Sequence, residues 1–463
     1  MGTDPGTQAS SDLPGAQASS QTDESIPEIS VHLTHQFPIP DFFTAEDLGI
    51  RPLQSCSRCQ NCTDCDFRRQ NITREQLKVV EKQESLMTLD KANKCIETSY
   101  AWTENVHDLK DNRGQAIAFQ RSIEKKLIKD NELDLYNEEV KKVVEKEHLR
   151  KMSPDEIARY TGPVSYVSHF PVYKDSKTTP IRLATNTSLK NKSCGLSPNE
   201  CMGDPPNALS SLITVFLRWR TYEVALNLDL TKAYQSVKTP GLLEQNVRRL
   251  VWRWGDKDQE WEIYCWMVMT FGDQLAALIL ELAKNIAADE GRDEDPEAVE
   301  ILITSTYVDD LCGGGTQAQV DRFKGTKLPD GSYSGTLPRI LSNVGLNTKV
   351  VVQSGETDKD ALDMFGNKVL GHGWDPTLDK LIFEFVVNLS AKNCKGERLE
   401  PNLTQQDIST LSERLLTKRR LLGLVMSQFD PTGLLSPITI KLKIQQSISG
   451  RLPDLCMRDK KNI

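Results

Sequence analysis

The sequence predicts an α+β protein in which helices pack against an antiparallel sheet. Two observations support this fold class. The β-branched run 301–308 leads into Asp309 and Asp310, and a glycine cluster follows at 313–315, which is typical of a β-hairpin with the acidic pair at its tip. Residues 273–288 instead repeat leucine and isoleucine at helical spacing, as a helix packed on a core does.

A second strand is predicted over residues 222–229, where apolar and polar side chains alternate. Period-two alternation places Leu226 and Leu228 on a core face and Asp229 on the opposite face. If this strand lies beside the hairpin, Asp229 converges with Asp309 and Asp310. The alternative for Asp229 is the N-cap of a helix that begins at the next residue.

Neighbouring carboxylates raise each other's pKa unless a cation collects beside them. Carboxylate oxygens suit Mg²⁺ or Mn²⁺, and two such ions about 3.5–4 Å apart clamp the attacking and leaving oxygens of a phosphoryl transfer. We therefore expect Asp229, Asp309 and Asp310 to bind metal and catalyse nucleotide polymerisation. The alternative for the acidic pair is a polar turn that caps a hairpin.

The order and spacing of several motifs are similar to those of reverse transcriptases, and more closely to those of BEL/Pao-type LTR retrotransposons. The motifs are Asp229 with Tyr234, Phe271-Gly272, the segment 307–310, and Lys349. Supporting segments lie at residues 174–182, 369–375, 416–422 and 429–437. The resemblance extends from about residue 45 to 447. It implies a right-hand polymerase fold with fingers, palm and thumb, an RNA or DNA template-primer, and dNTP substrates.

The resemblance also implies roles for individual residues. Asp229, Asp309 and Asp310 match the catalytic acids, and Tyr234 matches the aromatic residue that faces the sugar and excludes a 2′-hydroxyl. The alternative for Tyr234 is a buried aromatic residue at a strand–helix junction.

Other matched residues are nucleotide-binding in the family. Arg182 and Lys174, or Lys177 in its place, match the fingers residues that contact the triphosphate. Lys349 matches the lysine beside the leaving pyrophosphate. For these cations the alternative is a solvated surface position.

Phe271 and Gly272 match the family's nucleotide-binding turn, where a glycine lets template or nucleotide approach the backbone. The sequence departs from the family at residues 274–277 and at Thr185-Asn186. Both departures concern nucleotide positioning and remove no metal ligand.

Four cysteines at three-residue spacing, Cys56, Cys59, Cys62 and Cys65, form a small module. Four thiolates match the ligand number of Zn²⁺, although structural zinc sites usually separate their pairs by a longer loop. Reduced thiols without metal and an iron–sulfur cluster are the alternatives. BEL/Pao polyproteins carry a similar cluster before the polymerase.

Composition bounds the compartment and the partners. Eleven cysteines without a secretory leader favour a reducing environment, and no apolar run reaches membrane-spanning length. We therefore expect no membrane partner and an intracellular protein, in cytoplasmic particles or alternatively in the nucleus. The formal net charge is −8, but residues 174–192 and 418–443 are net basic, as a nucleic-acid groove requires. Oligomeric state does not follow from the sequence.

These patterns divide the chain into five segments. They are a disordered leader (1–40), the cysteine module (41–72), a helical segment (73–159), fingers and palm (160–366), and a primer-grip hairpin with thumb-like helices (367–463). No protease, RNase H or integrase motif is present, which indicates a fragment, a processed unit or a truncated copy. The main alternative to an active enzyme is a decayed or domesticated remnant that binds nucleic acid or a partner. An RNA-dependent RNA polymerase is disfavoured by Tyr234.

Overall fold

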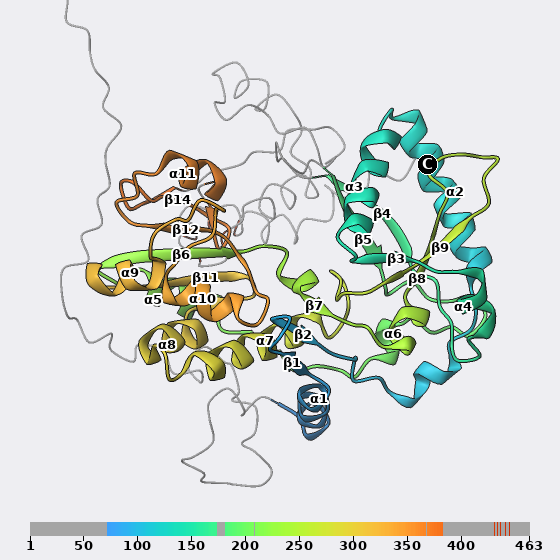
Figure 1. Ribbon diagram of the computed structural model, residues 1–463, viewed down its shortest axis with the longest axis horizontal. Coiled ribbons are helices and arrows are strands. Elements are labelled where there is room, and N and C mark those ends of the chain that lie inside the picture. Colours follow the sequence, from blue (N-terminus) through green and yellow to red (C-terminus); the bar gives the residue numbers. More distant parts are fainter. Residues whose placement is uncertain are drawn as a thin grey trace, which may run out of the picture. The chain divides into compact units, whose positions relative to one another are not determined.

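The computed structural model describes residues 72–173, 181–207, 209–366 and 368–382, together with 430, 433, 436, 440 and 444. Predictions for the leader, the cysteine module and the thumb-like helices therefore lie outside the described residues, apart from those few positions. Within the described chain, helices and small, mostly antiparallel sheets confirm the α+β prediction (Figure 1). Among the described helices, none combines the length and the apolar character needed to cross a membrane.

A four-stranded antiparallel sheet, here the central sheet, has the order β10-β11-β6-β12. Its strands are β6 (Val224–Leu230), β10 (Thr306–Tyr307), β11 (Asp310–Gly315) and β12 (Thr348–Gln353). Alternation along β6 sends Leu226 and Leu228 into one hydrophobic cluster and Ala225 into another. Both faces of β6 are therefore covered, and Asn227 opposite the leucines is buried as well.

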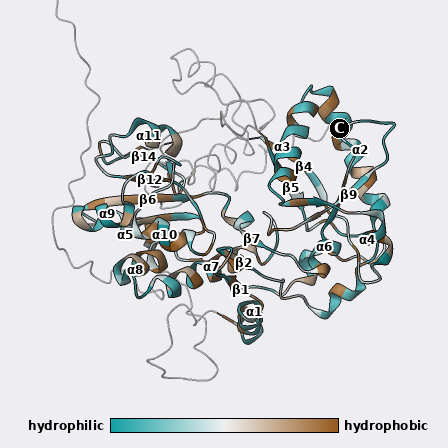
Figure 2. Cartoon of the chain, in the orientation of Figure 1, coloured by the Kyte–Doolittle hydropathy of each residue, from teal (hydrophilic) through white to brown (hydrophobic). Residues whose placement is uncertain are grey.

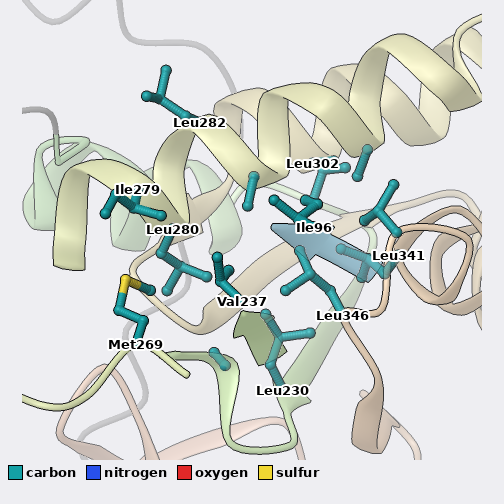
Figure 3. Packing of buried hydrophobic residues seen from close by; sticks show 14 of the residues in the cluster. Ile96, Leu230, Val237, Met269, Ile279, Leu280, Leu282, Leu302, Leu341 and Leu346 are labelled. Atoms are coloured by element: carbon teal, nitrogen blue, oxygen red, sulfur yellow. The ribbon is translucent and has the colours of Figure 1, made fainter. Parts of the chain in front are cut away.

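Helices cover the two faces of the central sheet. The first face packs on α7 (Ala276–Gly291), α8 (Pro296–Thr304), α9 (Gln317–Lys324) and α10 (Thr336–Ser342), and the second on α5 (Leu212–Trp219) and α11 (Lys359–Phe365). Figure 1 shows α8 and α11 on opposite sides of the sheet. Figure 3 shows Leu230, Ile279 and Leu341, which come from three different elements, around the hydrophobic core of the first face. The predicted helix over 273–288 is confirmed, shifted by about one turn.

The strand predicted over residues 301–308 is wrong for its first half, because residues up to Thr304 belong to α8. Asp295 caps this helix by accepting from the amide of Ala298, and Pro296 occupies its first turn. Strong N-terminal signals and helical burial of apolar residues outweigh the β-branched composition here. Only Thr306 and Tyr307 remain as strand.

A second group of elements precedes the Phe271-Gly272 turn. It comprises a three-stranded sheet, β3 (Leu149–Lys151), β9 (Glu262–Trp266) and β8 (Arg249–Trp252), a hairpin, β4 (Ser168–Tyr173) and β5 (Ile181–Asn186), and the helices α2 (Arg113–Lys129), α3 (Leu133–Glu145), α4 (Pro154–Arg159) and α6 (Leu242–Val247). Within the predicted helical segment 73–159, α3 ends at Glu145. Glu147 adopts a φ of 57°, and Leu149 then pairs with Trp266 in the sheet. The helices α2, α3 and α4 all lie within the segment 73–159 that the sequence predicts to be helical.

Short elements complete the described fold. They are α1 (Arg74–Ser85), a sheet of β1 (Thr88–Asp90), β2 (Cys95–Glu97) and β7 (Val237–Lys238), and the 3₁₀ helices η1 (Glu104–Asp108), η2 (Asn199–Cys201) and η3 (Ala233–Ser236). A capping box at Thr73 starts α1. In Figure 2, α1 is largely hydrophilic, whereas β6 is largely hydrophobic, as a surface helix and a central strand should be.

The predicted primer-grip region forms a three-stranded antiparallel sheet of β13 (Lys368–Val369), β14 (His372–Asp375) and β15 (Lys380–Ile382). Leu370 and Gly371 form a tight turn between β13 and β14. A second turn, over residues 376–379, joins β14 to β15, and residues 383–387 lie outside the described chain. Trp374 anchors this sheet against Trp219 of α5, with ring centroids 4.9 Å apart.

Candidate active site at the end of the central sheet

Asp229 and Asp310 face each other on neighbouring strands. They are Cα partners in the antiparallel pairing of β6 with β11. Directly opposed residues of such strands have Cα atoms about 4.5–5.5 Å apart. The register thus brings two of the three predicted acids together. It also excludes the N-cap alternative for Asp229, because β6 continues to Leu230 and η3 begins only at Ala233.

Asp309 lies at the tip of the β10–β11 hairpin. Tyr307 pairs with Asp310, so Val308 and Asp309 form a two-residue loop. Val308 has a φ of 57°, a left-handed conformation that costs a β-branched residue free energy. Such strain persists only where the surrounding structure imposes it, and it is concentrated at functional sites. The strained tip fixes Asp309 beside Asp310.

The acid cluster (Asp229, Asp309 and Asp310) has less positive charge around it than its carboxylates need. Burial raises the pKa of Asp310 to about 7, with further contributions from the charges of Asp309 and Asp229. Burial also raises the pKa of Asp309, and the charge of Asp229 adds to this effect. A site with these properties attracts cations.

Lys349 reaches the acid cluster from a β-bulge in β12. Thr348 pairs with Leu230 and Val350 pairs with Asp229, so Lys349 is the extra residue between them. Bulges redirect side chains in this way. The Lys349 Nζ donates to Asp229 Oδ2 at 2.8 Å, and its side chain is 45% exposed. A mobile ammonium group therefore contacts the cluster from the solvent side.

Tyr234 and Phe271, predicted separately to bind the nucleotide, are in contact. Their rings meet edge to face with centroids 5.0 Å apart. Tyr234 packs partly against the core, and burial raises its pKa, followed in size by the effect of the charge of Asp309. Phe271 is 40% exposed. The pair forms an aromatic surface beside the acid cluster. Tyr234 is only partly buried, so the alternative of a buried aromatic residue at a strand–helix junction accounts for its packing but not for its contact with Phe271.

Gly272 forms the turn that carries Phe271. Its φ of 94° is accessible to glycine and strained for other residues. Its carbonyl oxygen accepts from Thr187 Oγ1 at 2.8 Å and from Asn199 Nδ2 at 2.7 Å. The predicted departure at Thr185 also contacts this turn, since its hydroxyl lies 3.4 Å from that of Thr270.

Arg182 lies on β5 with an exposed side chain, and its charge acts on Asp309 and on Lys232. Arg182 is therefore close enough to the acid cluster to lower the pKa of Asp309, and its role as a triphosphate ligand stays a prediction. Lys174 and Lys177 lie outside the described residues. So do Cys56, Cys59, Cys62 and Cys65, and the metal predicted there is not tested.

The sequence analysis did not single out Lys284, because it treated the helix that contains this residue only as part of the hydrophobic core. Lys284 is 3% exposed on α7, and its Nζ lies 2.6 Å from Glu281 Oε2. Its positive charge lowers the pKa of Asp309. The signal was an i,i+3 pair of opposite charges, Glu281 and Lys284, inside an apolar helix.

Two further features of the site were also missed. The left-handed backbone conformation of Val308 could not be predicted from the sequence, because valine normally avoids a positive φ. The buried pairing of Arg248 with Asp273 behind the Phe271-Gly272 turn could not be predicted either, because it joins residues whose partners are set by tertiary structure.

The donor chemistry of the acid cluster fits a hard divalent cation, because three carboxylates with too little positive charge gather at one strand end. Within the described part of the chain, however, no group of three or more His, Cys, Asp and Glu side chains is arranged to hold a metal ion. Asp229 instead accepts from Lys349. Metal binding would require Asp229 to exchange this lysine for the ion.

Comparison with known proteins does not name a family. No protein-family model matches the chain, and a search of curated proteins also gives no match. The functional inference below therefore depends on the sequence motifs and on the geometry of this site.

Proposed function

We propose that this protein is the RNA-directed DNA polymerase domain of a BEL/Pao-type retrotransposon and transfers dNTPs to a primer 3′-hydroxyl. The observation that carries the proposal is the pairing of Asp229 with Asp310, with Asp309 fixed beside them by a strained hairpin tip. Like charges held together away from water are costly, so an arrangement that keeps them implies a cationic partner.

The same proposal interprets the fold as a right-hand polymerase. The central sheet would be the palm, and the β4–β5 hairpin with α2 and α3 would belong to the fingers. The sheet of β13, β14 and β15 would be the primer grip. Support comes from the order of the strands, since Asp310, Asp229 and Lys349 lie on three adjacent strands of one sheet and Asp309 lies in the hairpin loop beside Asp310.

Each residue of the site then has a defined task. Asp229, Asp309 and Asp310 would hold Mg²⁺ or Mn²⁺, which when bound lowers the pKa of the primer hydroxyl and neutralises the triphosphate. Tyr234 and Phe271 would contact the sugar and exclude a 2′-hydroxyl. Arg182 would contact triphosphate oxygens.

Lys349 would leave Asp229 when the site is loaded and donate a proton to the departing pyrophosphate. The bulge that carries it places its Nζ 2.8 Å from Asp229 Oδ2, and its exposed side chain is free to reorient.

A second candidate function is favoured by the same ion pair. If Lys349 is the permanent counter-ion of Asp229, the site is neutralised within the chain and needs no metal. The protein would then keep the scaffold as a nucleic-acid-binding or interaction protein without turnover, a decayed or domesticated remnant.

Template-primer extension separates the two candidates. We expect the unaltered chain to incorporate dNTPs on an RNA or DNA template with Mg²⁺ or Mn²⁺, and to use rNTPs poorly. Asp309→Asn should lower incorporation roughly a thousandfold or more, because a metal-binding carboxylate is lost. Asp289→Asn is the matched control, since Asp289 is exposed on α7 and, among the described residues, its carboxylate pairs with nearby Arg292.

Incorporation that persists in Asp309→Asn would contradict the assigned roles. Absence of incorporation by the unaltered chain with both metals, together with retained nucleic-acid binding, would favour the non-catalytic candidate. Equal use of rNTPs and dNTPs would instead point to an RNA polymerase.

A further inference from the structure

A fully buried ion pair lies directly behind the Phe271-Gly272 turn. The side chains of Arg248 and Asp273 are both 0% exposed, and Arg248 Nη1 lies 3.3 Å from Asp273 Oδ2. The hydroxyl of Tyr100 donates to the same oxygen at 2.6 Å. The guanidinium group also lies over the Tyr100 ring, 4.9 Å from its centroid. We call these three residues the Asp273 network.

Asp273 closes the turn. Its Oδ2 accepts from the backbone amide of Thr270 at 2.9 Å and from the Thr270 hydroxyl at 2.9 Å. The Asp273 amide in turn donates to the Thr270 carbonyl at 3.3 Å. Phe271 and Gly272 are the two residues between these contacts. Their backbone therefore depends on where the Asp273 carboxylate is held.

The network ties this carboxylate to distant segments of the chain. Arg248 also donates to the Val268 carbonyl at 3.0 Å and to the Thr239 hydroxyl. Glu244 accepts from the Tyr100 amide at 3.2 Å. The turn is thereby attached to segments around residues 100 and 240, which are far from it in sequence, and to residue 268, which directly precedes it.

Stability alone explains such a network poorly. A buried ion pair recovers little more than its own desolvation cost, so an apolar cluster would stabilise this position as well or better. What the charges provide is fixed geometry, because hydrogen bonds to Asp273 are directional. Phe271 depends on such fixed geometry, because its side chain is 40% exposed and its ring meets the Tyr234 ring edge to face.

We propose that the Asp273 network is a positioning device for sugar selection. It holds the Phe271-Gly272 turn so that the Phe271 ring supports Tyr234 in the orientation that accepts a deoxyribose and rejects a ribose. This inference rests on the proposed polymerase function. Arg248, Asp273 and Tyr100 act through Phe271 and Tyr234 and are positioning residues.

The test removes one hydroxyl group. Tyr100→Phe deletes the 2.6 Å bond that the hydroxyl donates to Asp273 and the 3.1 Å bond that it accepts from Arg248 Nη1, and keeps the ring under Arg248. We expect the ratio of kcat/KM for a dNTP over the matching rNTP to fall about tenfold, since hydrogen bonds to charged groups have effects of this order. The change should appear mainly in KM for the dNTP, with kcat little altered.

Tyr166→Phe is the matched control. Tyr166 is 2% exposed, its hydroxyl lies 3.3 Å from Arg249 Nη1, and that guanidinium group lies 5.7 Å from its ring centroid. It thus loses an equivalent buried hydroxyl next to a neighbouring arginine without touching the turn. The control should keep the sugar ratio. Equal loss of discrimination in both variants would mean general loosening and would overturn the inference.

Amide hydrogen exchange separates this inference from the proposed function. The peptide spanning residues 270–274 should exchange faster in Tyr100→Phe and remain unchanged in Tyr166→Phe. Faster exchange in a chain that extends no primer would refute the polymerase while keeping the network's hold on the turn. Unchanged exchange, or an unchanged sugar ratio in an active enzyme, would refute the positioning role itself.

Discussion

The acid cluster and the Asp273 network both withdraw carboxylates from water, but they balance the charge in opposite ways. Asp273 is fully buried and receives its countercharge from Arg248 within the chain. Asp310 lies beside Asp309 and Asp229, and its pKa rises to about 7 through burial and their charges. Asp273 thus has its countercharge within the fold, whereas Asp310 lies among like charges, which a bound cation would balance under the proposed function.

The largest expected effect is that Asp-to-Asn substitutions change the free energy of unfolding in opposite directions in the two regions. Asp273→Asn should destabilise the protein by about 3–5 kcal/mol, because it leaves Arg248 buried without a countercharge. Asp310→Asn should stabilise it by on the order of 1–2 kcal/mol at pH 7.5 without divalent ions, because repulsion is removed. Urea unfolding measures both. Destabilisation of similar size in both variants would remove the distinction.

A second effect concerns pH. The pKa of Asp310 is about 7 in the folded protein and 3.8 in its unperturbed state. Between these values the folded chain retains a proton that the unfolded chain has released, so this group makes stability fall as pH rises from about 4 to 7. The difference in Tm between Asp310→Asn and the unaltered chain should therefore grow across this interval and level off above it.

Thermal melts without divalent ions at several pH values measure this difference. Primer extension should rise over the upper part of the same range, since under the proposed function the ionised carboxylate is the metal ligand. A constant Tm difference from pH 4 to 8 would contradict the assigned environment of Asp310.

The smallest effect is expected at Lys349. Its ion pair with Asp229 is partly exposed, so Lys349→Met should change stability by less than about 1 kcal/mol. The rise in Tm on adding Mg²⁺ should however be larger than in the unaltered chain, because the ion no longer competes with the lysine. Lys91→Met, which removes the exposed pair with Glu290, is the control. Equal Mg²⁺ effects in all three proteins would favour Lys349 as a bystander.

Local periodicity made part of this structure predictable. Alternation over 222–229 correctly identified β6, and helical spacing correctly identified α7, because each pattern reports burial on one face. The same reasoning failed at Ile301, where β-branched residues occupy a helix that Asp295 and Pro296 initiate. Propensity is a weak guide when capping and packing oppose it.

The candidate site divides in the same way. The convergence of Asp229 with Asp310 followed from two predicted strands that lead to acids, whereas the motifs of Tyr234 and Phe271 did not predict that their rings are in contact. The contact of Lys349 with Asp229 could not be predicted either, because it depends on a one-residue irregularity of strand pairing. Long-range partners such as Arg248 for Asp273 leave no local trace in the sequence.

Because Lys349 is the extra residue of a β-bulge, the loss of one codon would remove its ammonium group without changing the strand pairing. Removing that residue would let Thr348 and Val350 follow one another in a regular ladder opposite Leu230 and Asp229, so the sheet would lose an irregularity and keep its pairing. A lineage could thus lose its ammonium group by an in-frame deletion and still inherit an intact scaffold.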